Sequence, residues 1–120
     1  MAEVKSKNEK PHYHGHRARL RERFLDSPKS LPDYEILELL LFPSSPRKDV
    51  KPLAKELIKT FGSFAKVLSA SDNDLAKIEG INISAIASIK STKEAASRLL
   101  LSEAKEKPIL NSWTKLLDYC

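Results

Sequence analysis

A chain of 120 residues that is 41% hydrophobic and 31% charged suits one globular domain with a modest core, which excludes a disordered chain. A membrane-spanning segment is not expected, because the longest apolar run, residues 36–42, is interrupted by Glu38. The single cysteine, Cys120, excludes an internal disulfide and is typical of a reducing compartment.

The net charge of +5 is unevenly distributed along the chain. Residues 1–25 contain seven Lys or Arg against three Glu, and residues 84–107 contain five against three acidic residues. Clustered positive charge favours a polyanionic partner. Charge alone is equally consistent with an alternative, in which the mild basicity only aids solubility.

The N-terminal half predicts a polar, disordered basic arm over residues 1–13, followed by three helices. The first is expected from Gly15 to about Asp26, and the second from near Pro32 to just before Pro43. The second has the densest apolar content, which predicts a central, nearly surrounded helix. The third spans residues 49–61, with Asp49 as N-cap and an apolar stripe at helical spacing.

The C-terminal half predicts three further helical segments. Gly62 should end the preceding helix, and Ser63 should cap a short helix that runs through Leu68. Ser71 with Asp74 resembles a capping box, and a long helix is expected from Ile83 to about residue 104. No run of alternating apolar and polar residues is flanked by turn signals, so we predict an all-α fold, a compact bundle of five to six short helices.

Residues 75–90 form the segment with the clearest functional chemistry. Leu75 and Ile78 precede a Gly80-Ile81-Asn82 turn, and three isoleucines at helical spacing follow it. Such a turn folds one helix back on another and leaves free N–H groups at the start of the second, which favour an anion. Gly80 permits a backbone that other residues resist, and Ile81 should point inward. Asn82 enters the left-handed region readily, and its side chain should cap the N–H of Ser84 or Ala85.

Basic side chains near this turn and on the first helix extend the candidate interface. Lysines after the turn can reach the same phosphate, although a solvated helix face is their commoner role. Arg17 and Arg21 share one side of the first helix, whereas Arg19 and Arg23 share another. One arginine pair is expected to contact nucleic acid while the other pairs with acidic residues of the same chain. The candidate nucleic-acid contacts are Gly80, Ile81, Asn82, Ile83, Ser84, Lys90, Lys93, Arg17 and Arg21.

Catalytic and metal chemistry is not predicted for this chain. His12, His14 and His16 alternate and would chelate a transition metal only weakly, because a structural zinc site needs four ligands. A nucleophile beside a base is not evident, and the three glycines are isolated rather than grouped in a phosphate-binding loop.

Residues 75–89 resemble a helix-hairpin-helix motif, whose usual core is Gly-hydrophobic-Gly. Residues 15–24, 31–42, 49–54 and 61–63 resemble the N-terminal region of the RadC-like DNA repair protein family. The chain departs from the motif at three positions: Asn82 replaces the second glycine, Glu79 replaces a common proline, and Ile86 replaces a small alanine. These departures favour the alternative of a hairpin used for packing or docking.

The resemblance implies non-sequence-specific binding of structured or duplex DNA through backbone phosphates, in the bacterial cytoplasm or nucleoid. RadC-like proteins usually continue into a metalloprotease-like (JAB/MPN) domain, of which residues 105–120 resemble a linker and the first residues. The resemblance therefore implies a helical domain over residues 14–104 that has neither enzymatic activity nor a cofactor. Zinc is expected, if at all, in the missing domain of the parent. The alternative is a protein-protein module that docks that missing domain.

Overall fold

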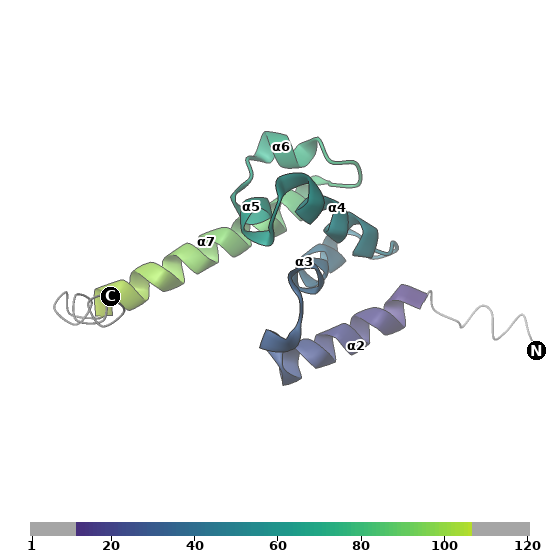
Figure 1. Ribbon diagram of the computed structural model, residues 1–120, viewed down its shortest axis with the longest axis horizontal. Helices are drawn as coiled ribbons and strands as arrows, with labels where there is room; N and C mark the ends of the chain where they lie inside the picture. The colour runs from purple at the N-terminus through teal and green to yellow at the C-terminus, as the bar shows by residue number, and fades with distance from the viewer. Residues whose placement is uncertain (1–11, 107–120) are drawn as a thin grey trace, which may run out of the picture.

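The computed structural model of the protein describes residues 12–106, and side chains from Gly15 onward. Within this range the chain is helical and contains no strand, which confirms the predicted all-α class (Figure 1). The elements in chain order are α2 (His12–Asp26), the 3-10 turn η1 (Pro28–Ser30), α3 (Asp33–Leu41), the 3-10 turn η2 (Phe42–Ser44), α4 (Lys51–Phe61), α5 (Phe64–Ser69), α6 (Asp72–Ala76) and α7 (Ile83–Glu106).

The outer boundaries of the first and last helices differ from the prediction. α2 begins at His12, three residues before the predicted start, and α7 continues to Glu106, beyond the predicted end near residue 104. The rest of the predicted arm, residues 1–11, and residues 107–120 of the predicted linker lie outside the described residues.

α3 is the central helix, as its apolar density predicts. It packs against α2, α4, α5 and α7, and Leu37 and Leu41 are fully buried. The core has members on every α-helix: Leu20, Leu31, Leu37, Leu41, Phe42, Val50, Ala54, Leu57, Val67, Leu75, Ala85 and Ile89. A core spread over so many short elements fixes the loops between them as well as the helices themselves.

Local caps set most of the helix ends. Gly62 ends α4 in the left-handed conformation, with φ of 102°, and its N–H donates to the Ile58 carbonyl at 2.8 Å. The Ser63 hydroxyl accepts the Lys66 N–H at 3.1 Å and begins α5, as predicted. The Ser71 hydroxyl accepts the Asp74 N–H at 3.1 Å and begins α6, as predicted.

The start of α4 differs slightly from the prediction. The Asp49 carboxylate accepts the Lys51 N–H at 3.0 Å, but the N-cap position itself belongs to Val50. Val50 is 2% exposed, so burial of its side chain fixes where the helix can begin. Asp49 therefore caps α4 from the position directly before the N-cap residue.

α7 has two different halves. Ala85 and Ile89 in its first half are buried, whereas every residue from 98 to 106 is exposed. In Figure 1 this second half extends away from the other helices. Within residues 12–106, no helix combines the length and the apolar character that crossing a bilayer requires.

Candidate nucleic-acid interface

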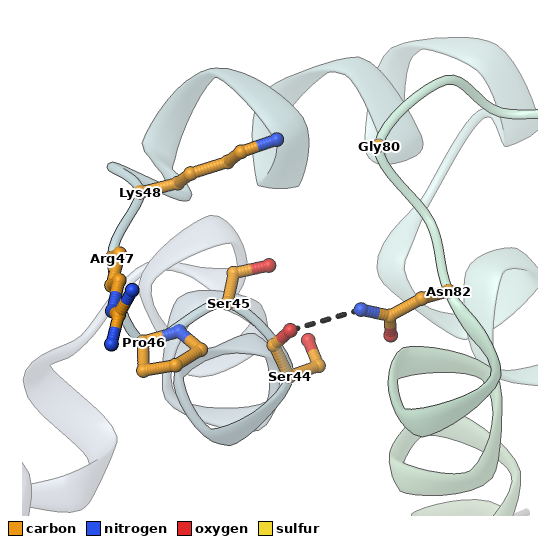
Figure 2. A pocket seen from close by; sticks show the side chains of 7 residues that line it. All are labelled: Ser44, Ser45, Pro46, Arg47, Lys48, Gly80 and Asn82. Carbon is orange, nitrogen blue, oxygen red and sulfur yellow. Dashed lines mark hydrogen bonds between the residues drawn. The ribbon is translucent and has the colours of Figure 1, made fainter.

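An open hollow of about 210 Å³ lies between the loop that follows α3 and the turn that precedes α7. Figure 2 shows the residues that line it, with the loop on one side and the turn on the other. The lining residues are Ser44, Ser45, Pro46, Arg47, Lys48, Gly80 and Asn82. The structure thus places the predicted turn opposite a basic loop that lies more than thirty residues earlier in the sequence.

Gly80 gives the turn its direction. Its φ of 95° lies in the region that L side chains rarely adopt, as the sequence predicts. A Cβ at this position would meet Leu53 at 3.6 Å, an ordinary contact, so the backbone angle rather than crowding requires glycine. Ile81 follows with its N–H donated to the Ile78 carbonyl at 3.2 Å, and its half-buried side chain packs against the core, as predicted.

Asn82 connects three parts of the site. Its Oδ1 accepts the Ala85 N–H at 2.9 Å, which confirms the predicted cap on α7. Its Nδ2 donates to the Ser44 carbonyl at 3.0 Å and ties the turn to the opposite loop (Figure 2). The expected left-handed backbone is not used, because all positive φ angles of the described residues belong to glycines. The side chain therefore acts as a cap and a cross-link.

The first turn of α7 keeps two N–H groups available. The Ile86 N–H reaches the Asn82 carbonyl at 3.1 Å and Asn82 caps Ala85, whereas within residues 12–106 the N–H groups of Ile83 and Ser84 have no recorded acceptor. Ser84 is exposed, and Ile83 is 79% exposed. Two free donors at the positive end of a 24-residue helix suit an anion.

The two candidate lysines have different environments. Lys90 Nζ donates to the Ala70 carbonyl at 2.7 Å and lies 3.8 Å from an Asp72 carboxylate oxygen. Its ammonium therefore connects α7 to the junction of α5 and α6 instead of pointing at a ligand. Lys93 is exposed and forms no ion pair within the described residues, so its ammonium is accessible to a binding partner.

Arg17 differs from the expectation of an exposed phosphate contact. It is only 6% exposed, and its guanidinium donates to the carbonyls of Phe42, Ser45 and Lys48. It also lies over the Phe42 ring, 4.6 Å from the centroid. A buried guanidinium engaged by three carbonyls is occupied within the protein. Arg21 lies over the same ring at 5.3 Å and remains exposed.

The second arginine pair is partly intramolecular. Arg23 donates two hydrogen bonds to Glu35, at 2.8 and 3.2 Å, in the forked geometry that joins guanidinium to carboxylate. These bonds and the charge of Glu35 raise the pKa of Arg23. The prediction that one arginine pair binds acidic residues is thus confirmed for Arg23, while Arg19 is exposed.

Of the alternating histidines, His16 is the one whose side chain the structure describes. Its Nε2 lies 3.1 Å from Oε1 of Glu38, which is fully buried. This contact joins α2 to α3 across the core. The side chains of His12 and His14 lie outside the described part.

Sequence reasoning missed Arg47 and Lys48, the two cations that line the hollow. Both are exposed, and neither side chain forms an ion pair within residues 15–106. The pattern that points to them is a short proline-bounded loop, residues 43–46, followed directly by two basic residues. A rigid loop presents adjacent cations in a fixed place.

Two curated relatives match most of this chain. It is 46% identical over 106 residues to a UPF0758 protein of Ruegeria pomeroyi, an alignment that covers 88% of this chain and 47% of the relative. It is 47% identical over 102 residues to a UPF0758 protein of Rhodobacter capsulatus, covering 84% of this chain and 48% of the relative. The chain is a homologue of UPF0758 proteins. It spans about half the length of these relatives.

Two further comparisons gave no match. Neither a family model nor a solved structure matches the chain.

Proposed function

We propose that this domain binds DNA without sequence specificity, through backbone phosphates held at the hollow between residues 44–48 and the turn before α7. The observation that carries the proposal is that the exposed cations Arg47 and Lys48 line the hollow together with Asn82, the residue directly before the free N–H groups of Ile83 and Ser84. Phosphate oxygens accept from backbone N–H groups at helix starts and from basic side chains alike.

The hairpin resemblance supports the same proposal. α6 and α7 stand in the predicted order, but α6 ends at Ala76, so the connection of six residues, 77–82, is longer than the three-residue turn that the sequence predicts. We infer that the UPF0758 relatives are RadC-like proteins and that the domain is the DNA-binding part of such a protein. In this proposal the domain itself has no enzymatic activity, and zinc would belong to a metalloprotease-like domain elsewhere in the parent.

DNA affinity measured across a salt series tests the proposal. Fluorescence anisotropy with a labelled branched DNA, a linear duplex and a single strand should show affinity that falls as salt rises. Replacing Lys93→Gln should lower the slope of log K against log salt by about 0.9, the loss of one phosphate contact. The matched control Lys105→Gln removes the same charge from the exposed end of α7 and should leave the slope unchanged. Absence of binding at low salt would refute the proposal.

Docking of another protein is the second candidate, favoured by one observation. Leu99, Leu100 and Leu101 are between 61% and 65% exposed near the end of α7. Three adjacent exposed leucines offer apolar surface for contact with another domain. A Leu100→Glu variant that binds DNA like the natural chain but loses association with the remaining half of the parent protein would assign docking to this end of α7.

A further inference from the structure

The loop of residues 44–48 forms one wall of the hollow and supplies its exposed cations. We propose that Lys48 and Arg47 contact a DNA phosphate, and that the buried Arg17 is the positioning residue that holds them in place. This inference rests on the proposed function and names contacts outside the hairpin.

The loop has few bonds of its own. Pro43 and Pro46 have no N–H to donate. The backbone bonds recorded within it run from the Ser45 N–H to the Phe42 carbonyl at 3.2 Å and from the Lys48 N–H to the Ser45 carbonyl at 3.4 Å. Both are long for N–H donors, so they hold the loop weakly, and the Ser44 hydroxyl adds a bond of 2.8 Å to the Leu41 carbonyl at the end of α3. Its conformation must depend on contacts from outside the loop.

Arg17 supplies the main external contact. Its guanidinium lies beneath the loop, donates to the carbonyls of Phe42, Ser45 and Lys48, and rests on the Phe42 ring. The three carbonyls run from Phe42, two residues before the loop, to Lys48, the last residue of the loop. The planar guanidinium has several N–H donors and can bond to all three carbonyls at once. A lysine ammonium has a different geometry and cannot reproduce this set of bonds.

Asn82 holds the same loop from the opposite side, through the Ser44 carbonyl at 3.0 Å. The loop is therefore fixed to α2 by Arg17 and to the start of α7 by Asn82. In Figure 2 Lys48 extends across the top of the hollow toward Gly80, and Arg47 lies at its outer edge beside Pro46. The neighbouring Asp49 carboxylate is engaged at the Lys51 N–H, 3.0 Å away. This arrangement leaves the Lys48 charge directed over the hollow.

The test is a double-mutant cycle on DNA affinity, measured on the full 120-residue chain with a linear duplex. One side of the cycle is Arg17→Lys, which keeps the charge and loses the fork. The other is the pair Arg47→Gln with Lys48→Gln, and the matched control is Lys29→Gln with Lys105→Gln, two exposed lysines outside the hollow. Hydrogen–deuterium exchange at Ser45 and Lys48 is measured alongside, because it reports the loop without DNA.

If Arg17 positions the loop, Arg17→Lys accelerates amide exchange in the loop while α4 and α7 stay protected, and it weakens binding roughly 5- to 10-fold, the value of about one phosphate contact. The same substitution then has little effect once the two loop cations are gone, because the effects are not additive. The control pair leaves affinity within about twofold of the natural chain.

Three results would overturn the inference. Natural affinity in Arg17→Lys would show that its charge, not its fork, matters. Additive losses would show that Arg17 and the loop act separately. Unchanged binding after loss of Arg47 and Lys48, with binding still reduced by Lys93→Gln, would leave DNA binding by the domain standing and would place the phosphate contacts on α7 instead of the loop. The loop pair keeps the side chain of Arg17 intact, so this last result stands even if Arg17→Lys does not fold.

Discussion

Ser84 offers a substitution that separates stability from binding. It lies in the first turn of α7, exposed, with an N–H that has no recorded acceptor within residues 12–106. In Ser84→Asp the new carboxylate sits at the positive end of the helix dipole, which stabilises such a position by about 0.3 to 1 kcal/mol. The same carboxylate would stand where the proposed phosphate binds.

The expected loss of affinity follows from Coulomb's law. Two like charges about 4 Å apart repel by about 1 kcal/mol in water, and the carboxylate also competes for the free N–H groups. DNA affinity should therefore fall roughly 5- to 10-fold while the free energy of unfolding rises. Urea denaturation measures the free energy of unfolding, and anisotropy with a labelled duplex in a salt series measures the DNA affinity.

A matched control isolates position from net charge. Ala65 occupies the corresponding second position of α5, is exposed, and does not line the hollow. Ala65→Asp should change the net charge equally and leave DNA affinity close to that of the natural chain. Equal weakening by both variants would mean that only net charge matters. Natural affinity in Ser84→Asp would refute a phosphate at the start of α7.

Three further substitutions test the geometry around the turn. Gly80→Ala places a Cβ at φ of 95° and should cost about 1 to 2 kcal/mol of unfolding free energy, measured in urea; an unchanged midpoint would contradict the need for glycine. Asn82→Ala removes both the cap and the link to Ser44 and should lower the free energy of unfolding by about 1 to 2 kcal/mol. Asn82→Asp keeps the cap and should lose less; equal losses in the two variants would show that the cap does not stabilise the fold. Lys90→Met leaves the Ala70 carbonyl without its donor and should lower the free energy of unfolding by about 1 to 2 kcal/mol. The salt slope of DNA binding should stay unchanged, and a reduced slope would show that Lys90 contacts a phosphate.

Local features of this fold are predictable from sequence because they involve neighbouring residues. The caps by Ser63 and Ser71 span three residues, and Gly62 needs its left-handed backbone only because α4 ends there. The cap from Asn82 to Ala85 belongs to the same class. Such contacts depend on the order of residues and not on how the helices pack.

Contacts over long sequence separations explain the rest. A helical wheel places Arg17 and Arg21 on the same side of α2, but it does not show that the loop after α3 covers one and leaves the other exposed. The link from Asn82 to Ser44 joins residues 38 positions apart, and the Lys90 bond to Ala70 joins residues 20 apart. Both require the packed core before either partner is near the other.

The uneven burial of α7 makes this helix a rigid spacer. Its core residues end at Ile89, and the helix continues to Glu106, which adds roughly 25 Å at about 1.5 Å per residue. The point where the chain leaves the helix is thus held at a set distance and rotation from the hollow. Inserting one residue in the exposed half would turn that exit by about 100°, whereas inserting seven would nearly restore its direction and move it about 10 Å farther out. The helix therefore sets both the reach and the orientation of whatever is joined beyond it.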